Sequence, residues 1–498
     1  MRGASFDAVK RRLGRTQQDP RCAGVRSTVD RPPRTDGAEG GAGHAPAARR
    51  RGAVVSDTVA RLNARRAAAS REGTRTASRA PISPPMPITT RQLECGMPLL
   101  VEAMPGVRSA ALTWLLPVGS AAFDDAEDGH AALLAEFVLR GAGGLDSRQH
   151  SEALARLGVQ RSAMVFSHHI QLGATMLGSR LAEALPLIAA MVTAPALPES
   201  ALESVRSLAL QALDGLDDDP QLLVLLRLKE RHQPHPLNRH GYGVRSVLES
   251  ASAEQLRAAW KRRAVPAGSI LAVAGDVDPD SVESHLNRLL SEWRGGGAPA
   301  IATSAPQRGT AHIEEQTAQT HLALAWDAPR EAEPTSMRER LLVRVLGSGS
   351  SSRLFTEVRE KRGLCYSVSA SYSGGRDRGM ISVYAGSTPE RASTTLAVIL
   401  AEVERLRQGV EQAEYRRAVV GLKSQLVMQG ESTAARSASL AGDQFRLGRP
   451  RTLAEIAAEV DRVTLDELNA HAAARRFEPM TQVSIGPNAP EPAIVATG

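Results

Sequence analysis

Two pairs of residues far apart in the chain are related by the same offset of 212 residues. Trp114 at the end of an early strand-like run corresponds to Trp326, and Leu256 in a late amphipathic segment corresponds to Leu468. Solenoid repeats recur every 20 to 50 residues or so, and this offset is much longer, which indicates that a whole domain was duplicated. We therefore expect two homologous domains that face each other across a cleft.

Short alternating runs and longer amphipathic segments are mixed in each repeat, which predicts an α+β fold. We expect each domain to be an α/β sandwich in which helices pack on an antiparallel-rich sheet. In the first repeat the expected strands are 98–103, 110–116, 162–166, 170–176 and 269–274. The expected helices are 131–140, 148–157, 180–192, 200–213 and 254–262.

The expected domains span residues 86–293 and 307–498, joined by a linker at 294–306 rich in Gly, Pro, Ala and Ser. Residues 1–85 have no sustained apolar period and are expected to be a disordered basic tail. This tail holds 18 Lys and Arg against 7 Asp and Glu, so it accounts for the net charge of +7 and leaves −4 for the remainder. Two accounts of it stay open: translation starts at Met86, or the tail is an Arg-rich targeting arm.

Composition removes several classes of function. Aromatic residues make up 3% of the 498, too few for a protein that stacks nucleic-acid bases. No apolar stretch has membrane-spanning length and no signal-peptide core precedes the fold, so we expect no membrane partner. The cysteines, Cys22, Cys95 and Cys365, are too far apart for a disulfide framework or a thiolate zinc site, and a cytoplasmic location is expected.

The most specific segment of the chain is residues 347–368, Gly-Ser-Gly-Ser-Ser-Ser-Arg-Leu-Phe-Thr-Glu-Val-Arg-Glu-Lys-Arg-Gly-Leu-Cys-Tyr-Ser-Val. It resembles the second domain of the pitrilysin/insulinase family of inverted-zincin metallopeptidases, in the short-chain branch related to mitochondrial processing peptidase. The resemblance extends over roughly residues 90–490 and includes Asp218-Asp219-Pro220 and His235-Pro236-Leu237.

In that family the first domain carries His-x-x-Glu-His on a helix, with a further Glu about 75 residues later. Positions i and i+4 share a helix face, so two imidazoles can bind one Zn²⁺ while the neighbouring Glu polarises its water. The resemblance places Ala132 and Glu136 at the two His positions, Ala135 at the general base and Ala212 at the third ligand. Alanine can neither bind zinc nor transfer a proton, so we expect no bound metal and no activity from this chain alone.

The other histidines near these positions are expected to be structural. His130 lies six residues before Glu136, on a different face of the helix. The adjacent His168 and His169 occupy a strand-like run, in which neighbouring side chains point to opposite faces. Three further histidines fall in a loop that the related peptidases build around His-Pro, and we interpret them as structural residues of that loop: His232, His235 and His240.

The same resemblance implies a substrate-binding pair, Arg359 and Tyr366, and both residues are present. In the related peptidases the phenol donates to the developing oxyanion and the guanidinium holds substrate carbonyls. Arg359 falls in the last turn of a helix that Gly363 can end in the left-handed conformation, and Tyr366 opens the next strand, so the turn directs both toward one site. Without the resemblance, the sequence is also consistent with Arg359 as a solvated side chain of the charged run 357–362 and Tyr366 as a half-buried side chain of a strand.

Gly347 and Gly349 are expected to form a flexible turn that touches substrate backbone. The alternative is a phosphate-binding loop, but the lysine of Gly-x-x-x-x-Gly-Lys-Ser/Thr is missing and Arg353 is a poor substitute for it.

We therefore expect a non-catalytic, substrate-binding subunit of a heterodimeric zinc metallopeptidase. The partner, expected to be encoded nearby, would be a catalytic peptidase subunit that carries the zinc, and the substrate would be an unfolded peptide. Two alternatives stay open: a purely structural or assembly subunit, and an autonomous metalloenzyme with unconventional ligands, which lacks a His/Asp/Glu set on one helix face.

Overall fold

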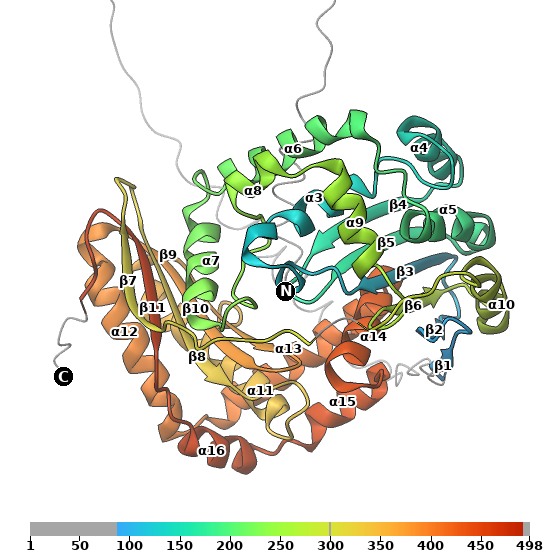
Figure 1. The fold of residues 1–498 in the computed structure, drawn as a ribbon. Helices are drawn as coiled ribbons and strands as arrows, with labels where there is room; N and C mark the ends of the chain where they lie inside the picture. Colours follow the sequence, from blue (N-terminus) through green and yellow to red (C-terminus); the bar gives the residue numbers. More distant parts are fainter. Residues whose placement is uncertain (1–86, 298–299, 492–498) are drawn as a thin grey trace, which may run out of the picture. The chain divides into compact units, whose positions relative to one another are not determined.

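Two β-sheets organise the chain (Figure 1). The computed structural model describes residues 87–297 and 300–491, so the expected basic tail at 1–85 lies outside the described residues. The described elements combine sheets with helices, which confirms the α+β class.

The first sheet has six strands in the order β1-β2-β6-β3-β5-β4. β2 and β6 run parallel, and the other neighbouring strands are antiparallel. The strands are β1 Thr89–Gln92, β2 Pro98–Ala103, β3 Ser109–Leu116, β4 Gln160–Val165, β5 Ile170–Leu177 and β6 Ile270–Gly275. The helices of this half are α3 His130–Phe137, α4 Ser147–Arg156, α5 Leu181–Thr193, α6 Glu199–Asp214, α7 Pro220–His232, α8 Arg245–Ser250, α9 Ala253–Arg263 and α10 Pro279–Leu289.

The second sheet has five strands in the order β7-β11-β8-β10-β9, with β7 and β11 parallel. Its strands are β7 Gly309–Glu314, β8 Thr320–Ala328, β9 Cys365–Gly374, β10 Gly379–Ser387 and β11 Thr481–Gly486. A π-helical turn, η4 Phe355–Glu360, precedes β9. The helices of this half are α11 Ser336–Gly347, α12 Ala392–Arg405, α13 Gln412–Gly430, α14 Thr433–Leu447, α15 Leu453–Arg462 and α16 Leu465–Ala474.

The two sheets correspond strand by strand. The order β2-β6-β3-β5-β4 in the first matches β7-β11-β8-β10-β9 in the second, and each contains one parallel pair at the same place. Trp114 in β3 and Trp326 in β8 are both buried, and each ring meets another aromatic ring edge-on. The expected duplication is confirmed, while the exact domain boundaries stay predictions.

Each sheet is covered on one face by helices of its own half and on the other by a helix from the opposite half (Figure 1). α7 packs on β8 and β11 of the second sheet, where Val224 and Leu228 join Ala323, Ala325 and Val483. In return, α14 packs on β3 and β6 of the first sheet through Leu440 and Ala441. The two halves therefore share their cores.

Polar contacts at these crossings are buried. Arg436 of α14 is 1% exposed and its Nε donates to Glu102 of β2 at 2.5 Å. Burial raises the pKa of Glu102, and the charge and hydrogen bond of Arg436 oppose that shift. At the other crossing, His232 Nδ1 lies 2.9 Å from Thr481 Oγ1.

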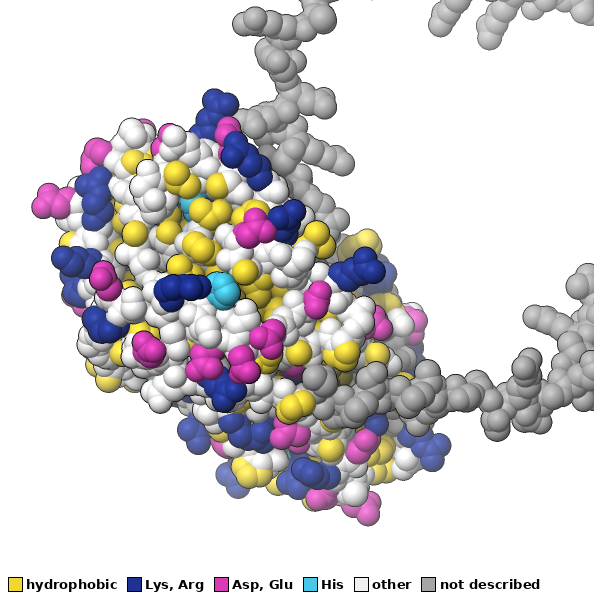
Figure 2. All heavy atoms as spheres, turned by 90° about the vertical axis from the view of Figure 1, so that its right-hand side faces the viewer, with side chains coloured by type: hydrophobic (Ala, Val, Ile, Leu, Met, Phe, Trp, Pro, Cys, Tyr) yellow, Lys and Arg dark blue, Asp and Glu magenta, His cyan; other side chains and the backbone are white. Residues whose placement is uncertain are grey.

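Figure 2 views the side of the molecule where α5 and α10 lie. Positive and negative side chains are interspersed around apolar ones there, so this face carries no field of a single sign. Among the helices that the structure describes, none is long and apolar enough to cross a membrane.

Candidate functional site

The positions matched to the family's first two zinc ligands and general base lie on α3. Gly129 precedes the helix with φ 149°, a backbone conformation that glycine adopts without a side-chain clash. Ala135 is buried in the core, whereas Ala132 and Glu136 are half-buried. No described residue forms a hydrogen bond or ion pair with the Glu136 carboxylate.

The fourth position, Ala212, lies near the end of α6, which packs against α3. The fold thus brings together the two helices that would carry a zinc site, but their matched positions offer one carboxylate and three methyl groups. This donor set does not fit Zn²⁺, which needs at least three protein ligands. Within 87–297 and 300–491, no three His, Cys, Asp or Glu side chains are grouped to hold a metal.

His130 is buried at the start of α3 and does not face a metal site. Its ring meets Phe123 edge-on at 5.7 Å between centroids, and its Nδ1 lies 4.0 Å from Glu127 Oε1. Burial lowers the pKa of His130, which favours the neutral ring.

The prediction that His168 and His169 point to opposite faces of a strand is wrong. Both lie in the turn between β4 and β5, where the alternation of a strand does not apply. Their rings both contact Phe445 of α14, at centroid distances of 5.2 and 5.1 Å. His168 also faces Asp377 at 3.4 Å, in the turn between β9 and β10.

The three histidines after α6 have three different polar partners. His232 ends α7 and contacts Thr481, as described above; His235 Nε2 lies 2.8 Å from Asp125, and His240 Nε2 lies 3.6 Å from Glu230. They do not converge on one centre.

The structure brings Arg359 and Tyr366 together. The Arg359 guanidinium carbon lies 5.4 Å from the Tyr366 ring centroid and 4.8 Å from that of Phe355, so the cation is stacked on two rings. Gly363 has φ 59°, and its N–H donates to the carbonyl of Arg359 at 3.1 Å, which closes the turn as expected. Tyr366 is 76% exposed, so its hydroxyl is accessible.

Arg359 does not take part in the ion pairs of its charged neighbours. Lys361 and Arg362 both bind Glu357, at 2.7 and 2.6 Å, and these contacts lower the pKa of that carboxyl. No described carboxylate lies within ion-pair distance of Arg359. Arg359 is exposed to solvent, and its guanidinium stacks on aromatic rings instead of pairing with the neighbouring carboxylates.

The two glycines of the expected substrate turn differ in their surroundings. Gly347 ends α11 in the core, and a Cβ there would lie 2.3 Å from the backbone nitrogen of Ala370 in β9. Gly349 is exposed with φ 93° and open space around it. Gly347 is therefore explained by packing, and Gly349 alone is placed where it could meet a substrate.

Two family models match the two halves of the chain. Residues 99–243 match "Insulinase (Peptidase family M16)", and residues 250–422 match "Peptidase M16 inactive domain". The chain belongs to the pitrilysin/insulinase family, peptidase family M16.

Among its M16 relatives are proteins named uncharacterized zinc proteases. One from Mycobacterium tuberculosis is 28% identical over 415 residues, which span 80% of this chain and 94% of the relative. One from Bacillus subtilis is 26% identical over 383 residues, which span 76% and 93%.

Solved structures share the M16 fold. A peptidase M16 inactive domain from Pseudomonas fluorescens superposes with a TM-score of 0.74 at 22% identity and covers 82% of this chain and 100% of its own. A protease from Helicobacter pylori also gives 0.74 at 18% identity, with coverage of 80% and 99%. At these identities the similarity concerns the fold.

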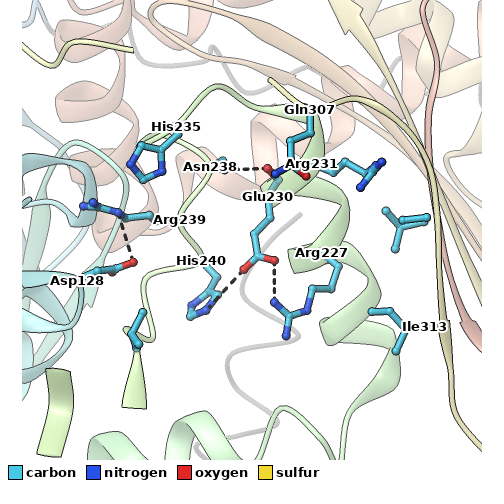
Figure 3. A pocket seen from close by; sticks show the side chains of 13 residues that line it. Asp128, Arg227, Glu230, Arg231, His235, Asn238, Arg239, His240, Gln307 and Ile313 are labelled. Atoms are coloured by element: carbon cyan, nitrogen blue, oxygen red, sulfur yellow. Dashed lines mark hydrogen bonds and ion pairs between the residues drawn. The ribbon is translucent and has the colours of Figure 1, made fainter. Parts of the chain in front are cut away.

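Sequence reasoning missed one feature of this M16 chain, a polar cavity of about 460 Å³ that we call the junction pocket (Figure 3). It lies between α7, the loop at 235–244, Asp128 before α3, and the strands β7 and β11 of the second sheet. The histidine-rich loop was the only signal of it in the sequence. The loop forms one wall, and the other walls come from segments far away in the chain.

Proposed function

We propose that this chain is the non-catalytic, substrate-binding subunit of a heterodimeric zinc metallopeptidase that processes or degrades unfolded peptides. The stacked, accessible pair Arg359 and Tyr366 is the observation that carries the proposal, because a degenerate zinc motif alone would equally suit a scaffold. We place the complex in the cytoplasm.

Stacking leaves the polar edges of the pair available. The guanidinium uses its flat face against the rings, so its N–H groups at the rim can donate to substrate carbonyls. The Tyr366 hydroxyl can donate to an oxygen that gains negative charge during peptide cleavage. Both donors gain strength once a second subunit closes over them and excludes water.

The zinc-dependent step belongs, in this proposal, to a partner with an intact His-x-x-Glu-His motif. This chain's remaining carboxylate, Glu136, cannot complete a three-ligand site. The chain therefore contributes binding and oxyanion stabilisation in trans, and the partner contributes the nucleophilic water and the general base.

The test compares this chain, an M16 subunit encoded beside it, and the mixture of the two. Metal analysis should find zinc in the partner at one per chain and no stoichiometric zinc here, and only the mixture should cleave an unfolded peptide efficiently. Gel filtration should show the heterodimer. One tightly bound zinc in this chain, or full activity of the partner alone, would contradict the proposal; the second result would favour the structural or assembly role.

A further inference from the structure

Arg359 differs from the other described arginines that lie over aromatic rings. Its guanidinium carbon lies over two rings, 4.8 Å from the centroid of Phe355 and 5.4 Å from that of Tyr366, whereas each of the others lies over one. Three of those others also pair with a carboxylate: Arg340, Arg376 and Arg475. Arg359 pairs with none of the described carboxylates, so the rings are its main contacts.

This kind of contact leaves the hydrogen-bond donors of Arg359 available. A carboxylate would accept from up to two of the guanidinium N–H groups and neutralise the charge. An aromatic ring attracts the cation electrostatically and takes up none of these donors as a conventional acceptor. The neighbouring cations Lys361 and Arg362 are bound by Glu357. Arg359 is therefore the cation of the run 357–362 that is free to bind a substrate.

The fold holds the two rings with different firmness. Tyr366 is 76% exposed and lies at a β-bulge near the start of β9. Its neighbours Cys365 and Ser367 pair with consecutive residues of β10, which leaves Tyr366 as the extra residue of the bulge. A bulge can aim a side chain, but the strand ladder does not hold this residue from the opposite side. Tyr366 alone is therefore a weak support for the guanidinium.

Phe355 is the firmer support, because it is half-buried in a turn that is anchored on both sides. Leu354 before it and Val358 after it are fully buried in the core of the second half. At the start of the turn, Arg353 donates two hydrogen bonds of 2.7 Å to Glu414 of α13. The Phe355 ring thus offers the exposed guanidinium a fixed surface.

We propose that Phe355 is a positioning residue that holds the Arg359 guanidinium in place for the substrate peptide. The inference rests on the proposed function, in which Arg359 binds substrate carbonyls. Phe355 lies four residues before Arg359, so the contact is local and is present before the partner or the substrate binds. A side chain that is already held loses less conformational entropy on binding, so Phe355 should lower KM.

Three variants of the full chain test this role in the reconstituted heterodimer. Phe355→Leu removes the ring and should raise KM about 3- to 30-fold with little change in kcat. Phe355→Tyr keeps the ring and should behave like the parent. Phe477→Leu is the matched control, since it removes a half-buried ring under Arg475, which Glu339 also holds, and it should leave both constants unchanged. Melting curves check that each variant folds.

A double variant separates positioning from packing. If Phe355 acts through Arg359, then Phe355→Leu should have no further effect on KM in an Arg359→Met background. The same fold-increase in both backgrounds would overturn the proposal. A parental KM in Phe355→Leu would also overturn it, as would an equal loss in Phe355→Tyr. An unchanged KM in Arg359→Met alone would instead contradict the proposed function.

A measurement without catalysis keeps the two claims apart. In the full chain with isotope-labelled arginine, the NMR signal of the Arg359 Nε–H group is identified by its loss in Arg359→Met. Aromatic ring currents should shift this signal upfield, and Phe355→Leu should move it toward the position of a solvated arginine such as Arg416, which is exposed. A signal that does not move would overturn the positioning role even in an active heterodimer. A signal that moves, together with an inactive heterodimer, would reject the proposed function alone.

Discussion

The charged run at 357–362 shows how much a single residue's role depends on its local backbone. Spacing and family resemblance predicted that Arg359 and Tyr366 come together, and the structure places the guanidinium 5.4 Å from the ring. The second ring under the guanidinium, Phe355, lies four residues before Arg359, and side chains at this spacing share a helix face, so this contact could also have been predicted. The π-helical form of the turn η4 could not be predicted, because no sequence pattern marks where a π-turn occurs.

At the same scale, Gly347→Ala should destabilise the fold. The new methyl group would lie 2.3 Å from a backbone atom of β9, which cannot move like a flexible side chain, so we expect a loss of about 1 to 3 kcal/mol in the free energy of unfolding. Gly296→Ala is the control, since nothing lies within 4 Å of its added methyl group, and it should change stability by about 0.5 kcal/mol or less. Denaturant unfolding measures both, and equal stability of the two variants would disprove the packing explanation.

At the scale of elements, the apolar periods predicted most helices and strands of the first half well. The strand expected at 98–103 matches β2 Pro98–Ala103, and the helix expected at 200–213 matches α6 Glu199–Asp214. The error at His168 and His169 has a physical cause. The turn between β4 and β5 contains no glycine or proline to mark it, and both rings turn toward Phe445, a residue that is distant in sequence.

His232, at the end of α7, makes a prediction about pH. Burial, with a smaller contribution from Arg308, lowers the pKa of His232 to about 4 in the folded protein, against 6.5 for the exposed side chain. The unfolded chain therefore binds the proton first as pH falls. Stability should drop between pH 6.5 and pH 4, and this residue's share of the loss is about 3 kcal/mol.

His232→Gln should remove that share and make the free energy of unfolding less dependent on pH over this range. Chemical denaturation of both proteins at several pH values measures it. An unchanged pH dependence in the variant would show that His232 is not held neutral by burial.

At the scale of the molecule, the duplication was predictable and the exchange of helices was not. An apolar stripe shows that α14 must be buried on one side, but it does not identify the sheet that covers it. The structure shows that α14 covers the first sheet and α7 the second, so each half completes the core of the other. The junction pocket was unpredictable for the same reason, since its walls come from both halves.

Separate expression of the halves tests this mutual dependence. Residues 86–297 alone would expose the apolar surface that α14 covers: Leu100, Leu115, Ile270, Ala272 and Ala274. We expect this fragment to aggregate or to bind a hydrophobic dye, and to become soluble when co-expressed with residues 300–498. A monomeric fragment that unfolds cooperatively without the other half would contradict it.

The central claim is that this chain assists catalysis in a partner's active site, and Tyr366→Phe tests it most directly. The change removes one hydroxyl and keeps the ring that stacks on Arg359. The measurement is kcat for peptide cleavage by the reconstituted heterodimer, with assembly of the variant checked by gel filtration. Loss of one oxyanion donor should lower kcat about 10²- to 10³-fold. An unchanged kcat in a fully assembled heterodimer would contradict the account and leave this chain a scaffold.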